Sequence, residues 1–186
     1  MLKRLLSSRE TLLFAAIAAL LGLIATRFPG FVTPSSLAGV LNDTSPLILL
    51  AIGQMIVILT KCIDLSVAAN LALTGMVVAM LNTAFPGLPM VFILAVAIGL
   101  GTLLGMFNGI LVWKLNIPPI VVTLGTMTIF RGVIFLISDG KWVNSHEMSA
   151  AFKALPRGVF AGLPMLSWVA IAAVILFTVV MTRTTL

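Results

Sequence analysis

Charged side chains are scarce in this sequence. Only 9% of its 186 residues are Asp, Glu, Lys or Arg, whereas a soluble domain carries about 25% charged residues. Apolar residues make up 61% of the chain, and the mean hydropathy is +1.24. The chain therefore has too few polar groups to cover a surface that faces water. This composition predicts that its outer surface is buried in lipid.

Residues for catalysis are also scarce. The single cysteine, Cys62, excludes an intramolecular disulfide. The single histidine begins a His146-Glu147 pair, but Ala150 stands where a metalloprotease motif needs its second histidine. The glycine and lysine spacing of a phosphate-binding loop is missing, so the chain is not predicted to bind ATP itself. Its net charge of +6 is spread singly between apolar runs, which argues against a nucleic-acid surface.

The rest of the sequence consists mainly of long apolar runs. A helix that crosses a membrane needs about 20 apolar residues. We therefore expect one all-α domain over residues 1–186, a polytopic transmembrane helix bundle with spans at residues 11–28, 46–60, 65–81, 90–113, 120–137 and 163–181. A short surface helix is expected at residues 37–41, and a polar outer loop at residues 138–164.

The basic residues predict how these spans are oriented. The first run follows basic residues as in a signal peptide, but it lacks a convincing cleavage site, so we interpret it as an uncleaved span. With the N-terminus in the cytoplasm, the cytoplasmic side would carry Lys3, Arg4, Arg9, Lys61, Lys114 and Arg183, and the outer side Arg27, Lys141, Lys153 and Arg157.

A polar break at Lys61 and Asp64 separates the second run from the third. Charges at membrane depth are expensive, so they mark a helix boundary, a buried pair or a transport path. The second run is short for a full crossing, which predicts a helix broken near Lys61. Asp64 has two interpretations. It caps the next helix by accepting from the backbone N–H of Ser66 or Val67, or it forms a polar hinge with Lys61 or Arg131 at the rim of a path.

Small residues recur every four positions along the fourth run, at Ala97, Gly101, Gly105 and Gly109. Glycine lets two helix backbones approach closely in lipid, so this stripe predicts tight helix packing. The alternative is that the stripe lies near a moving centre of the bundle. Asn108 lies in the same region, and its amide is expected either to bond a neighbouring helix or to line a polar path.

Arg131 follows Pro119 by twelve residues, which places it about 18 Å along the fifth span. It lies either deep in the membrane or extended to the outer rim, and we interpret it as a residue of the path. Three hydroxyl groups share its helix, on Thr123, Thr126 and Thr128. Each threonine is expected to donate to a carbonyl one turn earlier.

Four segments in order resemble a known family: residues 63–67 (IDLSV), 107–112 (FNGILV), 117–127 (IPPIVVTLGTM) and 131–132 (RG). They are similar to the permease subunit of bacterial ABC sugar importers, in the branch of the ribose-, xylose- and rhamnose-type systems. Cys62 and Ala68 stand where this family often has glycine, which suggests the rhamnose-like subgroup. Family permeases continue past a sixth span, so the chain resembles about their N-terminal half.

The resemblance implies a transporter subunit and not an enzyme. It implies import of a monosaccharide, such as a deoxyhexose, across the bacterial inner membrane. The expected partners are a second permease, a pair of cytoplasmic ATPases that bind ATP and magnesium, and an extracytoplasmic sugar-binding protein that docks on residues 138–164. No cofactor or metal is expected on this chain. Lys61 and Asp64 are the candidate hinge, and Asn108 and Arg131 the candidate path residues.

Two other functions remain open from the sequence. A non-transporting fragment or assembly subunit would pack against other permeases through Gly101, Gly105 and Gly109. A secondary transporter would need acidic residues inside its spans for coupling to protons or cations, and Asp64 is the one acidic candidate that we identified.

Overall fold

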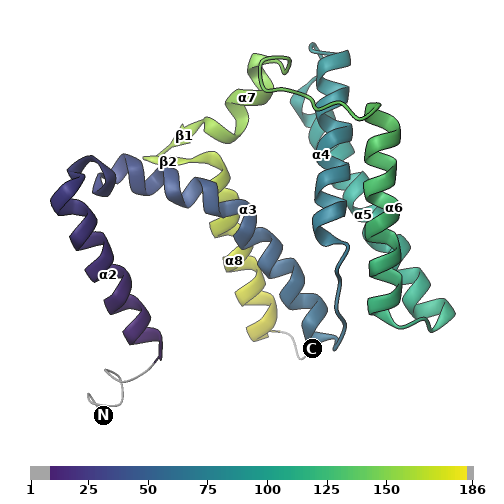
Figure 1. Cartoon of the computed structure of the whole chain (residues 1–186), viewed down its shortest axis with the longest axis horizontal. Helices are drawn as coiled ribbons and strands as arrows, with labels where there is room; N and C mark the ends of the chain where they lie inside the picture. The colour runs from purple at the N-terminus through teal and green to yellow at the C-terminus, as the bar shows by residue number, and fades with distance from the viewer. Residues whose placement is uncertain (1–8, 184–186) are drawn as a thin grey trace.

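The computed structural model describes residues 9–183 of the chain (Figure 1). Its helices are α2 (Arg9–Arg27), the 3-10 helix η1 (Pro29–Val32), α3 (Pro34–Leu59), α4 (Val67–Ala84), α5 (Met90–Leu115), α6 (Pro119–Ser138), α7 (Ala150–Arg157) and α8 (Met165–Arg183). Strands β1 (Val159–Phe160) and β2 (Leu163–Pro164) form an antiparallel hairpin in which Phe160 lies opposite Leu163.

Five of these helices, α3, α4, α5, α6 and α8, are long and apolar enough to cross a membrane. The apolar part of α2, Thr11–Arg27, is shorter than the other five. The expected all-α, polytopic membrane fold is therefore confirmed. Five helices meet the length of a span in the described part of the chain, against the six that the sequence predicts.

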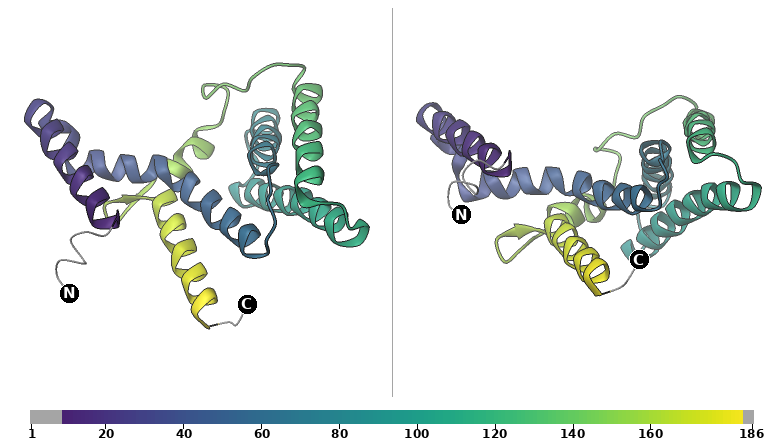
Figure 2. Two further views of the ribbon diagram at one scale, coloured as in Figure 1. Left: turned by 60° about the horizontal axis from the view of Figure 1, so that its bottom comes forward. Right: turned by 90° about the horizontal axis from the view of Figure 1, so that it is seen from below.

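The helices form two groups. Helix α4 packs against both α5 and α6, which also pack against each other, whereas α3 packs along α8. Figures 1 and 2 show the two groups side by side, with α2 apart from both. The core of the first group is a small cluster between α4 and α6, formed by Ala69, Leu73 and Phe130.

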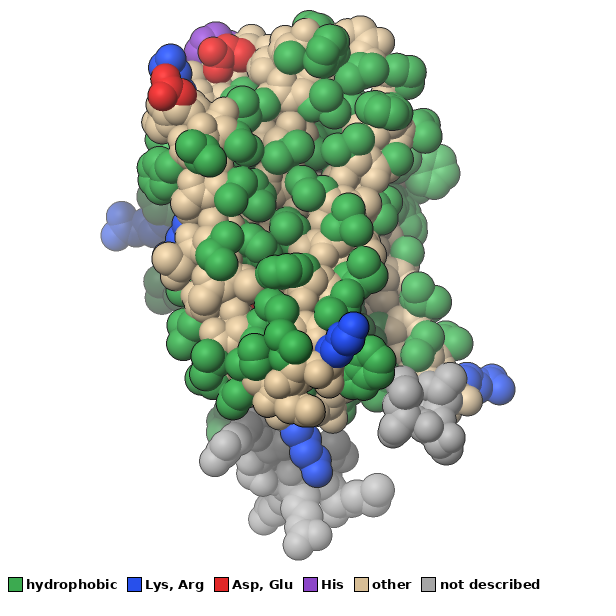
Figure 3. Space-filling model, turned by 90° about the vertical axis from the view of Figure 1, so that its right-hand side faces the viewer, with side chains coloured by type: hydrophobic (Ala, Val, Ile, Leu, Met, Phe, Trp, Pro, Cys, Tyr) green, Lys and Arg blue, Asp and Glu red, His purple; other side chains and the backbone are tan. Residues whose placement is uncertain are grey.

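Large apolar side chains cover the outside of the molecule. Ile98 is 70% exposed and Leu136 is 81% exposed, although both lie within long helices. Figure 3 shows apolar side chains over most of one face, with several charged side chains at its two ends. Such a surface is stable against lipid and not against water. The chain is a multi-pass membrane protein.

Helix α3 differs from the sequence prediction. The structure has one continuous helix from Pro34 to Leu59, in place of a short surface helix and a separate span starting near residue 46. Pro46 lies inside it and removes one backbone donor. The hydroxyls of Thr44 and Ser45 donate to the carbonyls of Val40 and Leu41, 2.7 Å away in each case. The helix therefore bends in its middle and does not end there (Figure 1).

The two ends of the bundle carry different basic residues. Helices α3, α5 and α8 finish at the lower end in Figure 1, so Lys61, Lys114 and Arg183 lie there. The connection from α6 to α7, which holds Lys141, lies at the opposite end (Figure 1). We call these the inner end and the outer end. These names follow the orientation expected from the sequence and serve here as labels for the two ends.

Candidate functional site

The segment between α3 and α4 builds the centre of the site. Lys61 ends α3 in a left-handed conformation, with φ of 59°, and its N–H donates to the Ile58 carbonyl. The chain then runs without helical structure to Val67, where α4 starts. Asp64 Oδ1 accepts from both the backbone N–H and the hydroxyl of Ser66, each at 2.7 Å. Asp64 thus accepts from the Ser66 N–H, as expected, although Ser66 is the N-cap residue of α4 and no side chain caps the first turn of that helix.

Asn108 of α5 closes a polar network with this segment. Its Nδ2 donates to Ser66 Oγ at 2.7 Å, and the two residues are only 5% and 1% exposed. Because a carboxylate only accepts, the Ser66 hydroxyl must donate to Asp64, and Asn108 must then present its N–H₂ to Ser66. The Asn108 Oδ1 is left buried without a hydrogen-bond partner. An unpaired buried acceptor costs about 1–3 kcal/mol, so this oxygen needs an explanation.

A cavity of about 220 Å³ lies beside this network. Its walls come from the end of α3, the α3–α4 segment, α5 and the start of α6. The polar side chains that line it belong to Thr60, Cys62, Asp64, Asn108 and Thr123. The rest of its wall is formed by Val57, Ile63, Gly105, Gly109, Val112 and Pro119. We call this space the inner cavity. It brings together residues from three of the four segments that carry the family resemblance.

The glycine stripe is divided between two environments. Asn70 of α4 donates from Nδ2 to the Gly101 carbonyl at 3.2 Å, so helix packing holds at Gly101. A methyl group at Gly105 or Gly109 would meet no atom within 4 Å in the described part of the chain, and both glycines line the inner cavity. Within the described residues α5 thus meets α4 at Gly101, whereas tight packing at Gly105 and Gly109 stays a prediction.

The predicted charge pair at the hinge is not formed. Among the described residues the ion pair is Lys141 with Asp139, at 3.4 Å. Asp64 bonds to Ser66, and neither Lys61 nor Arg131 is its partner. Thr123 reaches this segment instead, since its hydroxyl lies 3.4 Å from the Ile63 carbonyl. Thr126 and Thr128 donate to carbonyls one turn earlier, as expected.

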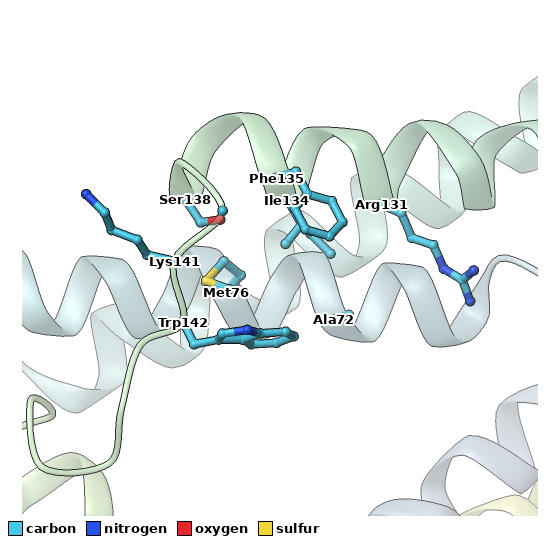
Figure 4. Close-up of a pocket in the computed structure, with 9 residues that line it drawn as sticks. Ala72, Met76, Arg131, Ile134, Phe135, Ser138, Lys141 and Trp142 are labelled. Carbon is cyan, nitrogen blue, oxygen red and sulfur yellow. The ribbon is translucent and has the colours of Figure 1, made fainter.

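Arg131 lies apart from the inner cavity, near the outer end of α6. It is seven residues before the end of the helix, or about 10 Å along its axis. Figure 4 shows its guanidinium extending from α6 past Ala72 of α4. With Met76, Phe135 and Trp142 it lines a pocket of about 200 Å³. Arg131 forms no ion pair with any residue that the structure describes. If a polar path crosses the bundle, its candidate residues are Asp64 and Asn108 near the inner end and Arg131 near the outer end.

The outer loop is more ordered than the sequence indicates. Within residues 138–164 lie helix α7 and the β1–β2 hairpin. Asn82, which is 1% exposed, holds the start of α7 by two hydrogen bonds: Nδ2 donates to Ser149 Oγ at 3.0 Å, and Oδ1 accepts from the Ser149 N–H at 2.8 Å. Asn82 directly follows the predicted span at residues 65–81, and only its position opposite the loop reveals this role.

This loop carries charges of both signs. The backbone N–H of Asn144 donates to the Glu147 carboxylate, and this hydrogen bond lowers the pKa of Glu147 below its ordinary value. Glu147 therefore stays ionised at neutral pH. It lines a second outer pocket of about 420 Å³ together with Lys141 and Trp142. The loop presents charges of both signs and an exposed indole.

Replacing Asn82 with alanine should loosen the outer loop. The change removes two hydrogen bonds and leaves the Ser149 N–H without its acceptor, which costs about 1–3 kcal/mol. We expect trypsin to cleave after Lys141 and Lys153 about fivefold to a hundredfold faster. Thr83→Ala is the control, because Thr83 bonds within its own helix. Equal cleavage rates for the two variants would contradict the role of Asn82.

The polar groups of this arrangement lie at the two ends of the bundle. The structure places no three His, Cys, Asp or Glu side chains close enough to hold a metal ion within the residues it describes. A polar network lies beside a small cavity at the inner end, and Arg131 and Trp142 line one pocket at the outer end.

Comparison with known proteins agrees with this arrangement. Residues 36–186 match the family model described as branched-chain amino acid transport system / permease component. The Autoinducer 2 import system permease protein LsrC of Enterobacter sp. (strain 638) is 36% identical over 184 residues, covering 98% of this chain and 52% of that protein. The protein of the same name from Salmonella typhi is 34% identical over 184 residues, covering 99% of this chain and 52% of its own.

No solved structure matches the chain. The chain spans about half the length of the curated relatives it matches. The family match covers residues 36–186 and includes every residue of the inner cavity. The importer-permease resemblance read from the sequence is confirmed: the chain belongs to the family of branched-chain amino acid transport system permease components.

Proposed function

We propose that the chain forms the membrane-spanning part of an ATP-driven importer for a small polar solute. The observation that carries this proposal is the family match over residues 36–186, which includes the buried Asp64–Ser66–Asn108 network. Buried polar groups inside a membrane bundle are costly and are kept at substrate paths. ATP hydrolysis would belong to a separate ATPase pair, which binds ATP and magnesium, and this chain would supply the path.

We propose the solute class from the names of the relatives, which are permease proteins of autoinducer 2 import systems. The proposed cargo is autoinducer 2 or a similar small solute. Cys62 and Ala68 suggested the rhamnose-like subgroup, but these relatives do not support rhamnose as the cargo. L-rhamnose is therefore the competing solute in the uptake experiment. An extracytoplasmic binding protein would select the solute before it reaches the path.

The expected orientation follows from the ends of the bundle. The inner end, which carries Lys61, Lys114 and Arg183, would face the cytoplasm of a bacterial inner membrane, because the sequence assigns six basic residues to this side and four to the other. The outer loop, with α7 and Trp142, would then face the binding protein. The inner cavity would lie on the side of the ATPases, where a solute leaves the path.

An uptake experiment tests the proposal. In an Enterobacter strain without its own LsrC, the aligned segment of that protein is replaced by this chain, and uptake of autoinducer 2 is measured. We expect the chimera to restore uptake to within about tenfold of the native permease, with at most weak inhibition by a hundredfold excess of L-rhamnose.

The amount of each protein in the membrane fraction is the control. A chimera that inserts normally but takes up neither solute would overturn the importer function and favour a non-transporting assembly subunit. Uptake that persists without the ATPase would instead indicate a secondary transporter.

A further inference from the structure

We propose that the β1–β2 hairpin and the end of α7 bind an acidic phospholipid at the outer surface of the membrane. Val159 and Phe160 would enter the boundary between the headgroups and the acyl chains. Arg157, with Lys153 one turn earlier, would bind the lipid phosphate. This inference goes beyond the proposed function, because it concerns a lipid site on the outer loop and holds whichever solute the protein carries.

The first argument is the position of the hairpin along the membrane. Helix α8 has 19 residues, so it is about 28 Å long and only just spans a hydrocarbon core of about 30 Å. Strand β2 ends directly before α8, and the Met165 N–H donates to the Gly158 carbonyl at 2.7 Å. The hairpin is therefore tied to the first residue of a span (Figure 1). It lies where the acyl chains give way to headgroups.

The second argument is that the hairpin exposes apolar side chains in a fixed arrangement. Val159 is 70% exposed and Phe160 is 67% exposed. Phe160 lies opposite Leu163, so a two-residue turn joins the strands. Both residues of this turn, Ala161 and Gly162, have positive φ, at 49° and 83°, as in the type I′ turns that match the twist of hairpin strands. The hairpin thus holds out two side chains for which water is a poor environment.

Trp168 connects the hairpin to the boundary between lipid and water. Its indole N–H donates to the Phe160 carbonyl at 2.9 Å, and its ring meets the Phe160 ring edge-on, with 6.2 Å between the centroids. Tryptophan is enriched at this boundary, because its ring is apolar and its N–H needs an acceptor. Since Trp168 lies close to the start of α8, it holds Phe160 at the same depth.

The third argument is the charge beside these apolar side chains. Lys153 and Arg157 are four residues apart on α7 and so lie on the same face of that helix. Neither forms an ion pair within the part of the chain that the structure describes. Residues 148–186 contain no acidic side chain, and Asp43 is the one acidic residue of α3, on which β2 packs. A lipid phosphate supplies the negative charge that this surface lacks, and the planar fork of arginine suits its oxygens.

A soluble protein partner fits this surface less well. The hairpin packs on α3 and α8 and directly precedes a span, so a partner in water would meet it only at the lipid boundary. The polar part of the outer loop lies elsewhere, since Lys141, Trp142 and Glu147 line the pocket of about 420 Å³ beside the end of α4. That part remains the expected contact for an extracytoplasmic binding protein.

A fluorescent label at Val159 tests the depth of the hairpin. The full chain with Cys62→Ser and Val159→Cys is labelled with an environment-sensitive dye in vesicles of phosphatidylcholine and phosphatidylglycerol. A label at Ser145→Cys, in the polar part of the loop, is the matched control. We expect a nitroxide near the headgroup end of the acyl chain to quench the Val159→Cys label at least about fivefold more than the control. Iodide on both sides of the membrane should give the reverse order.

The choice of lipid tests the phosphate site. At equal mole fractions, nitroxide-labelled phosphatidylglycerol should quench the Val159→Cys label at least about fivefold more than nitroxide-labelled phosphatidylcholine, because each basic residue near an acidic lipid adds about fivefold to the affinity. Lys153→Gln with Arg157→Gln should reduce this ratio to less than about twofold. Lys141→Gln removes a charge from the polar part of the loop and should leave the ratio unchanged.

Two results would overturn the proposal. Equal quenching of the Val159→Cys and Ser145→Cys labels by lipid would show that the hairpin lies in water and is open to a soluble partner. Equal quenching by the two lipids would show an apolar anchor without a site for acidic lipid. A label at Ala161→Cys keeps both apolar side chains and repeats the measurement, and it must give the same order for the proposal to stand.

Discussion

Asn108→Leu is expected to reduce solute uptake at least tenfold, while its two effects on stability, the loss of the donor to Ser66 and the removal of a costly unpaired acceptor, oppose each other. Leucine has a similar size but cannot donate to Ser66 Oγ, a hydrogen bond of 2.7 Å between two buried side chains. It also removes the unpaired Oδ1 that faces no other donor. Stability is measured as the unfolding midpoint in detergent, and uptake in the chimera.

A double-mutant cycle with Ser66→Ala tells whether the effect passes through the network. Ser66→Ala removes the hydroxyl that links Asn108 to Asp64. Residues in one hydrogen-bond network show coupling energies of about 0.5–3 kcal/mol, whereas independent sites add to within about 0.3–0.5 kcal/mol. If the free-energy changes of the two single variants add up to that of the double variant, Asn108 acts independently of Ser66. That result would contradict a role for the hydrogen-bond network in the site.

The sequence located Asp64 and Asn108, but it did not predict what joins them. Both stand out because polar side chains are rare in apolar runs. Ser66 is inconspicuous, since a single serine is common near a helix start, and only the approach of α5 to the α3–α4 segment makes it the link. Charge alone suggested Lys61 and Arg131 as partners of Asp64. A hydroxyl and an N–H two residues away satisfy the carboxylate at less cost in chain entropy.

The remaining differences come from non-local contacts. Pro46 predicted a helix start, but the hydroxyls of Thr44 and Ser45 occupy carbonyls of the preceding turn and let α3 continue. The glycine stripe predicted a packed helix face, but periodicity cannot show where along α5 the neighbouring helix passes. The outer loop acquires structure from Asn82, which belongs to another helix. For the glycine stripe and the outer loop a partner distant in sequence decided the outcome, whereas at Pro46 the contacts within α3 did.

Arg131→Leu is expected to change stability and function in opposite directions. Arg131 lies on an apolar helix about 10 Å from its end and has no carboxylate partner in the described part of the chain. Translocon-based scales assign arginine at the centre of a span a cost of about 2.5–3.5 kcal/mol, and leucine a small gain. Removing the charge should therefore favour insertion of α6 by about 2 kcal/mol, as measured by glycosylation mapping of the isolated span.

The same substitution should reduce uptake at least tenfold. The guanidinium is the charged group of α6 at the pocket of about 200 Å³ that Phe135 and Trp142 also line. Leucine at this position offers a solute no hydrogen-bond donor. Arg131→Lys keeps the charge but loses the planar fork of donors, so it should insert like the native chain and transport at an intermediate rate. Normal uptake by Arg131→Leu would mean that the arginine serves orientation or assembly. A loss of both insertion and uptake would mean that the charge stabilises α6 through a partner outside this chain. Since an unpaired charge on an apolar helix is costly, a role in the path is the explanation that we propose for Arg131.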